Sequence, residues 1–165
     1  MQSNNIIERI INAPTGSALA QAMEQRAEIL QLSQASHDAV VQPKEPGGLS
    51  HGERAALAER IARLNKDDDL AQHYRACLNS VGAHEELIAI TDPTRSIDAS
   101  ERMNAIVRFT DLVTIRPREA TKGDVEMLKG AGMAEADIVR LTELLAFVNY
   151  QLRVVAGFKL ARSIK

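Results

Sequence analysis

The feature that most constrains the fold is a pair of consecutive helical patterns in residues 49–82, joined by a short polar turn. The stretch reads LSHGERAALAERIARLNKDDDLAQHYRACLNSVG. Ser50 is a strong helix N-cap, and the Glu53 side chain can reach back to its amide, which makes a capping box. Apolar residues then recur at three- and four-residue spacing, which gives the first helix an apolar face. These residues are Leu57, Ile61 and Leu64.

The second helix of the pair begins after an elbow at residues 65–69. Three acids, Asp67 to Asp69, stand where the helix dipole favours negative charge, and Gly82 is suited to end the helix in the left-handed conformation. The first helix also carries a second, charged face. Its members are Arg54, Glu59, Arg60 and Arg63. The two patterns together predict a central helical hairpin.

The remaining patterns predict helices and no strand, so we expect an all-α fold. The predicted helices cover residues 3–12, 15–37 with an uncertain tail to 42, 84–90, 98–116, 121–130 and 134–161. Asp98, with Glu101 three residues later, is the expected cap of the fourth of these. The Pro- and Gly-rich segment 43–48 is a clear break. We therefore predict one domain, residues 1–165, with an N-terminal helical arm (1–42) and a core (49–161).

The last predicted helix, 134–161, is the most apolar part of the chain. One stripe carries Leu141, Leu145, Val148, Leu152 and Val155, and the flank carries Leu144, Phe147 and Val154. A helix that is apolar nearly all round is expected at the centre of a fold or at a subunit interface. We therefore expect an obligate homo-oligomer that assembles through this helix and the N-terminal arm.

Composition excludes several classes of function. The 20 basic and 22 acidic residues give a net charge of −2, with no field that would attract nucleic acid or anionic lipid. No apolar run approaches the ~20 residues of a membrane span, and the N-terminus does not resemble a signal peptide. A single cysteine excludes an internal disulfide and a CxxC site within one chain. We expect a soluble cytoplasmic protein without nucleic-acid or membrane partners.

Two strings of the sequence resemble one known group. The first is the helix from Leu49 to Asn65, and the second combines RFTD at 108–111 with FVNYQLRV at 147–154. Both are similar to the carboxymuconolactone decarboxylase superfamily, the all-helical group that contains the AhpD alkylhydroperoxidases and uncharacterised peroxidase-related proteins. The resemblance implies an AhpD-like helical bundle that forms homo-oligomers, such as dimers, trimers or hexamers. Active members of the family reduce peroxides with a Cys-x-x-Cys pair, a histidine and a glutamate.

This chain departs from that pattern at each of these catalytic positions. When the elbow is aligned with the family's redox turn, Asp67 and Leu70 take the places of the two cysteines. Tyr74 takes the place of the histidine, and Ala55 that of the glutamate. A dithiol mechanism needs an attacking thiolate and a second thiol that resolves the sulfenic acid. The resemblance therefore implies the fold and a binding or partner role with an unknown ligand, without dithiol peroxidase activity.

Cys77 and His73 are the strongest remaining candidates for chemistry. Their four-residue spacing places them on one face of a helix. One hypothesis is an oxidoreductase in which Cys77 is a single peroxidatic cysteine, activated by His73 and regenerated by an external thiol. The interpretation we favour is that Cys77 is an inert, buried apolar residue with His73 as a cap or at the surface. The residues expected to enclose its sulfur are Ala76, Leu78 and Val81, together with Leu57 or Ile61 of the partner helix in the hairpin.

A third hypothesis is a cofactor-free lyase or isomerase in which His73, Tyr74 and Glu59 act as acid–base groups. We predict no metal site and no cofactor, because consecutive acids at a helix start do not converge on one ion. His37, His51 and His84 are assigned no chemistry, since none has an acidic or sulfur partner at ligand spacing. Asn149, Tyr150 and Arg153 are expected to hydrogen-bond across the core or the subunit seam, or to line a small-ligand pocket.

Overall fold

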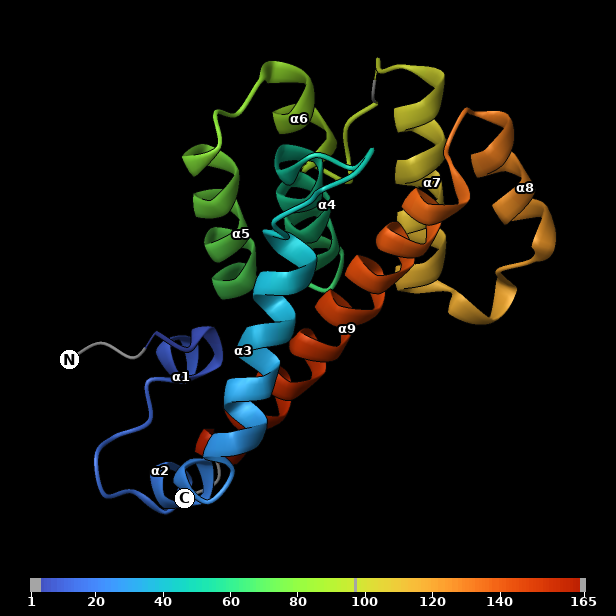
Figure 1. The fold of residues 1–165 in the computed structure, drawn as a ribbon. Coiled ribbons are helices and arrows are strands. Elements are labelled where there is room, and N and C mark those ends of the chain that lie inside the picture. Colours follow the sequence, from blue (N-terminus) through green and yellow to red (C-terminus); the bar gives the residue numbers. More distant parts are fainter. Residues whose placement is uncertain (1–3, 97, 164–165) are drawn as a thin grey trace.

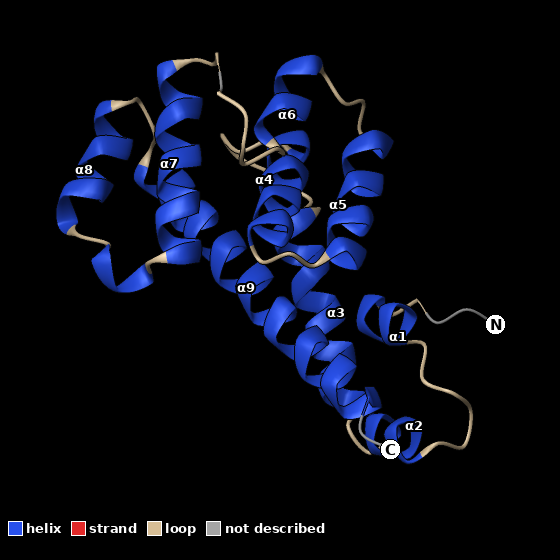
Figure 2. Ribbon diagram, turned by 180° about the vertical axis from the view of Figure 1, so that it is seen from behind, coloured by secondary structure: helices blue, strands red, loops and turns tan. Residues whose placement is uncertain are grey.

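The computed structural model describes residues 4–96 and 98–163, which fold into helices joined by short loops (Figure 1). Within these residues there are nine α-helices and one 3-10 turn, and Figure 2 shows no strand among them. The all-α prediction is confirmed. The elements are α1 (Ile6–Ile11), α2 (Ala18–Glu24), α3 (Ala27–Val41), α4 (His51–Leu64), α5 (Asp68–Ser80), α6 (Glu85–Ile90), α7 (Glu101–Ile115), η1 (Pro117–Glu119), α8 (Lys122–Gly130) and α9 (Glu135–Ser163).

The hairpin of α4 and α5 is formed as the sequence predicts. Ser50 caps α4 with a full capping box: its hydroxyl accepts from the Glu53 amide, and its own amide donates to the Glu53 carboxylate at 2.7 Å. The elbow is tight, since Lys66 has a φ of 57° and Asp67 then caps α5 by accepting from the Leu70 amide. Gly82 ends this region with a φ of 82°, the left-handed conformation that glycine adopts at low cost.

Helix α4 is the centre of the molecule. It packs against α3, α5, α6, α7 and α9, and its alanines let these helices approach closely. Its charged face is buried as well, because Arg54, Glu59 and Arg60 are almost inaccessible to solvent. Only Arg63, near the end of the helix, reaches the surface to a large extent.

The long apolar helix predicted at the C-terminus is α9, which crosses the molecule diagonally in Figure 1. It contacts α1, α2, α3, α4, α7 and α8, and buries both the predicted stripe and the flanking Leu144 and Phe147. By length and composition α9 could also cross a membrane. In this fold it packs against helices on several sides. One side, with Val139, Tyr150 and Leu160, stays exposed.

The N-terminal arm is divided into helices differently from the prediction. The single helix expected at 15–37 is broken at Gln25 and Arg26, where the Arg26 amide bonds the Met23 carbonyl in a tight turn. No proline or glycine causes this break. The turn lets α2 fold onto α9 and bury Met23, so tertiary packing outweighs helix propensity. The tail that the sequence left uncertain is helical, since α3 continues to Val41.

The arm also packs on its own chain, because α1, α2 and α3 all contact α9. Arg162 near the end of α9 donates to the Ile11 carbonyl at 2.7 Å, which ties the two ends of the chain together. Ser3, the expected start of the first helix, lies outside the described residues; Asn5 caps α1. The arm therefore supplies part of the cover over α9 within its own chain.

One predicted cap is wrong. Ser100, not Asp98, caps α7, and its hydroxyl accepts from the Met103 amide. The helix begins at Glu101, so the residue directly before it takes the capping position, where serine serves as well as aspartate. The Asp124 carboxylate accepts from the Thr121 amide at the start of α8, as the sequence predicts.

Candidate functional site

The candidate site is a cluster of His37, His73 and Cys77 where α3 meets α5. His73 and Cys77 lie one turn apart on α5, with 3.7 Å between His73 Nε2 and Cys77 Sγ. His37 comes from α3, and its Nε2 lies 3.1 Å from His73 Nε2. The potential ligand atoms of the three side chains all lie within 4.8 Å of one another.

This arrangement corrects two of the predictions made from the sequence. His37 does have a histidine and a sulfur at ligand distance, but its partners are 36 residues or more away in sequence, so local spacing could not reveal them. Cys77 is half-buried and faces His73, whereas Ala76 and Val81, which were expected to enclose it, are exposed. His73 neither caps a helix nor faces solvent; its ring points to α3.

The hydrogen-bond partners at the two ends of the cluster fix how the imidazoles carry their protons. His37 Nδ1 lies 3.0 Å from the Asp38 carboxylate, so it is protonated and donates, which leaves Nε2 as an acceptor. Arg9 Nη2 lies 3.2 Å from His73 Nδ1, and since arginine can only donate, that nitrogen accepts. His73 Nε2 therefore carries the proton and donates it to His37 Nε2. One hydrogen-bonded chain runs from Arg9 to Asp38.

Burial keeps this cluster uncharged. It lowers the pKa of His73 to about 4, with smaller contributions from His37 and Arg9. Burial also lowers the pKa of His37, against the opposing effect of Asp38. The pKa of Cys77 is raised, again chiefly by burial, although Arg9 acts in the other direction. At neutral pH the site therefore holds two neutral imidazoles and a protonated thiol.

Aromatic side chains line the inner side of the cluster. The His37 ring stacks on Tyr74 with centroids 6.0 Å apart and meets the edge of Phe147 at 6.1 Å. Tyr74 is fully buried and donates its hydroxyl proton to Gln151 Oε1 on α9. Burial raises the pKa of Tyr74, so the phenol stays protonated. Its visible role is to join α5 to α9.

Glu59 does not reach this cluster. Its carboxylate is fully buried and pairs with Arg63 and Arg75, each at 2.8 Å. Arg75 follows His73 by two residues, so the two side chains leave opposite sides of α5. The structure thus separates Glu59 from His73 and Tyr74, which the lyase or isomerase hypothesis places together.

The two elbow positions that the resemblance aligns with cysteines, Asp67 and Leu70, have structural roles. Asp67 caps α5 and forms an ion pair with Lys159 of α9 at 2.9 Å. Leu70 is fully buried in the core. Lys159 also pairs with Asp69 at 2.8 Å. Of these acids, Asp67 is a helix cap, as predicted, and Asp67 and Asp69 also form an ion-pair network with Lys159 that the sequence did not indicate.

We expected Asn149 and Arg153 to hydrogen-bond across the core, but both bond within their own helix. The Asn149 amide donates to the Leu145 carbonyl and Arg153 to the Asn149 carbonyl, both within α9. Tyr150 and Arg153 lie on the exposed side of the helix, while Gln151 is the polar residue that reaches inward. The buried polar residue of this part of α9 is therefore Gln151, one position after Tyr150, and the sequence analysis did not name it.

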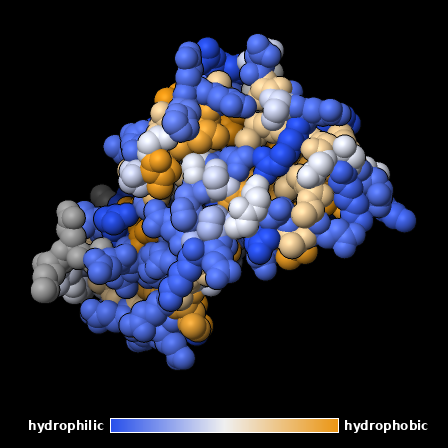
Figure 3. Space-filling view, turned by 45° about the horizontal axis from the view of Figure 1, so that its top comes forward, coloured by the Kyte–Doolittle hydropathy of each residue, from blue (hydrophilic) through white to orange (hydrophobic). Residues whose placement is uncertain are grey.

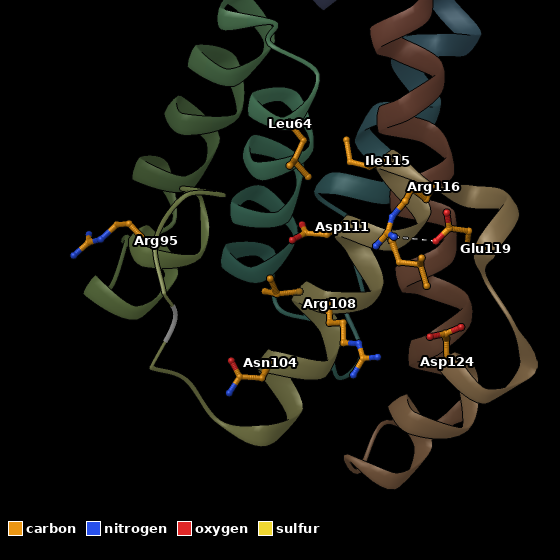
Figure 4. Close-up of a pocket in the computed structure, with 11 residues that line it drawn as sticks. Leu64, Arg95, Asn104, Arg108, Asp111, Ile115, Arg116, Glu119 and Asp124 are labelled. Carbon is orange, nitrogen blue, oxygen red and sulfur yellow. Dashed lines mark ion pairs between the residues drawn. The ribbon is translucent and has the colours of Figure 1, made fainter.

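A shallow groove of about 760 Å³ lies at the opposite end of the molecule, between α4, α7, η1 and α8 (Figure 4). Its labelled charged groups are largely paired: Asp111 holds Arg60 at 2.6 Å, and Arg116 pairs with Glu119 at 3.0 Å. Figure 4 shows Arg95 turned away from the groove. The RFTD string lies here, and its aspartate is the partner of a buried arginine. None of the sequence candidates for catalysis lines this groove.

No family model and no curated protein matches the chain. The fold does match a crystal structure of an uncharacterized peroxidase-related protein from Silicibacter sp. TM1040, with a TM-score of 0.71. The identity is 20%, and the match covers 81% of this chain and 69% of the other. At this identity the likeness concerns the fold alone. The all-helical architecture predicted from the sequence, with its central hairpin and long C-terminal helix, is thus the architecture of a peroxidase-related protein.

Proposed function

We propose that this chain is a binding protein built on the peroxidase-related fold, without dithiol peroxidase activity. The observation that carries the proposal is the structural role of two residues at the elbow: Asp67 is a helix cap and Leu70 is buried in the core. Neither position can host a thiol reaction. The only cysteine is protonated at neutral pH, and the imidazole next to it is neutral.

The test is steady-state reduction of an organic hydroperoxide by the reduced full-length protein, with a small-molecule thiol as reductant. Cys77→Ser is the matched variant. We expect the two proteins to consume peroxide equally, at the rate of the thiol alone. Thiol-dependent turnover by the wild type that is lost in Cys77→Ser would overturn the proposal.

The same measurement decides the second candidate, a one-cysteine peroxidase. The observation in its favour is the 3.7 Å contact between His73 and Cys77. In that reaction the thiolate attacks the peroxide, the O–O bond breaks, an alcohol leaves and an external thiol reduces the sulfenic acid. The first step needs the thiolate. A neutral His73 gives it little stabilisation, so we rank this reaction second.

We also propose that copies of the chain assemble in the cytoplasm, where the single thiol stays reduced. Support comes from apolar side chains left exposed on α3 and α9. They are Ile29, Leu32, Val139, Tyr150 and Leu160. The face shown in Figure 3 is mainly hydrophilic, with separate apolar patches. Sedimentation equilibrium measures the assembly; a stable species at 18.1 kDa, the mass of one chain, would overturn it.

A further inference from the structure

We propose that His37, His73 and Cys77 form a zinc site with two nitrogen ligands, one sulfur ligand and an open fourth position. The proposal rests on the meeting of three soft or borderline ligand atoms from two helices, α3 and α5. It does not depend on whether the protein turns over peroxide, so the two ideas can fail separately.

Two of the three distances between the ligand atoms are close to those of tetrahedral coordination, and the third pair, His37 and Cys77, lies within 4.8 Å. With Zn–N near 2.0–2.1 Å and Zn–S near 2.3 Å, tetrahedral angles place two nitrogens about 3.3 Å apart and nitrogen and sulfur about 3.6 Å apart. The observed separations are 3.1 Å between the two Nε2 atoms and 3.7 Å between His73 Nε2 and Cys77 Sγ. Binding an ion needs shifts of only a few tenths of an ångström in these two pairs, and His37 and Cys77 must come to about 3.6 Å from each other.

A carboxylate orients one of the imidazoles in advance. The Asp38 side chain accepts from His37 Nδ1, so the lone pair of Nε2 points into the cluster. A carboxylate on the far nitrogen of a histidine is the usual outer partner of a metal ligand, because it fixes the tautomer and makes the ligand more basic. His37 is held further by the rings of Tyr74 and Phe147.

His73 must rearrange before it can bind the ion. In the metal-free chain its Nε2 carries the proton, and its Nδ1 accepts from Arg9. Binding moves that proton from Nε2 to Nδ1, so Arg9 has to turn away, which its exposed position allows. The Cys77 S–H bond breaks as the Zn–S bond forms, and its proton leaves to solvent. One proton is released for each ion bound, and no electron is transferred.

The ligand set selects the kind of metal. Two imidazoles and a thiolate suit Zn²⁺ and copper, whereas Mg²⁺ and Ca²⁺ require oxygen ligands. Three protein ligands leave one coordination position for water or a small molecule, as in catalytic zinc sites.

Ser33 lies one turn before His37 on the same face of α3. It is buried, and its hydroxyl is one of three buried side-chain atoms in the described residues without a hydrogen-bond partner.

The primary test uses reduced, metal-free, full-length protein titrated with Co²⁺ and then with Zn²⁺. We expect one Co²⁺ per chain with a thiolate-to-cobalt charge-transfer absorption, displaced by one equivalent of Zn²⁺. Calorimetry in buffers of different ionisation enthalpy should show one proton released per ion. If the wild type shows no thiolate band with Co²⁺, the proposal is wrong, whatever the variants do.

Variants then locate the ion. Cys77→Ser should abolish the thiolate band, and Cys77→Ser and His37→Ala should each weaken Zn²⁺ binding more than about tenfold; Asp38→Asn should weaken it about tenfold. Arg9→Gln should strengthen binding, because it removes a positive charge and its amide oxygen can accept from the protonated Nδ1 of His73; a purely structural cluster would not produce this gain. His84→Ala, at an exposed histidine outside the cluster, is the control. Unchanged Zn²⁺ binding by Cys77→Ser would place the ion elsewhere and overturn the proposal.

Discussion

The two helices at the centre of the molecule are opposites in composition and in exposure. Helix α4 carries five charged residues among its fourteen and is nevertheless buried almost throughout. Helix α9 is long and apolar enough to span a membrane, yet one of its sides faces solvent. Composition alone would have placed α9 inside and the charged face of α4 outside. Hydrogen-bond partners, not hydropathy, decide the position of α4.

The buried charges of α4 are each matched by several partners. Arg54 donates to three backbone carbonyls, those of Val40, Pro46 and Leu49, each at 2.8 Å. Arg60 is held by Asp111 and by the carbonyls of Ile90 and Asp92. A buried charge is tolerable only with this degree of pairing. These arginines connect α4 to α3, α6, α7 and the loops around it, which an apolar side chain could not do.

The largest effect that tests this contrast between α4 and α9 is expected at Arg54. Arg54→Met keeps much of the side-chain volume but leaves three carbonyl oxygens without their donor. We expect a loss of about 3–5 kcal/mol in the free energy of unfolding, since each buried acceptor costs at least about 1 kcal/mol. Urea denaturation monitored by circular dichroism measures it.

Arg153→Met on the exposed side of α9 is the matched control, with an expected change within about 0.5 kcal/mol. Equal losses in the two variants would mean that burial does not distinguish the arginines of α4 from those of α9.

A smaller effect is expected at the contact between the hairpin and α9. Tyr74→Phe removes the hydroxyl that donates to Gln151 and leaves a buried acceptor on α9. We expect a loss of about 1–3 kcal/mol. Tyr150→Phe, at the only other tyrosine of the chain, should be close to neutral because that ring is 42% exposed. A double-mutant cycle of Tyr74→Phe with Gln151→Leu should show coupling; additive losses would contradict a direct bond.

Much of the fold could be predicted because its signals are local. The capping box at Ser50, the acids of the elbow and Gly82 act within a few residues of themselves, so periodicity and caps were sufficient to find the hairpin. The break at Gln25 was missed because it has no local cause. It exists so that α2 can fold onto α9, and contacts of that kind are not visible in the sequence of either helix.

The candidate site was only half predictable for the same reason. The pair His73–Cys77 follows from helical spacing, but His37 joins it through the packing of α3 against the rest of the fold. Glu59 shows the opposite error. It lies on the neighbouring helix of the hairpin, yet its pairing with Arg75 on the far side of α5 keeps it from His73. The order of the helices indicates which elements pack together, but the direction of each side chain determines which residues are in contact.

The smallest effect on the stability of a single chain is expected on the exposed side of α9. Val139 is 57% exposed, so Val139→Ser should change the free energy of unfolding of the monomer by less than about 0.5 kcal/mol.

Val139 and Tyr150 are eleven residues apart, about three helical turns, and therefore share one side of α9. If copies assemble through this side, the same change weakens the assembly while the monomer keeps its fold. Sedimentation equilibrium over a dilution series separates the two effects. A dissociation constant raised in Val139→Ser, with unchanged circular dichroism, supports an interface here. Loss of helical signal at concentrations where only monomer exists would show instead that this side of α9 is needed for the fold itself, and the contrast with α4 would fail.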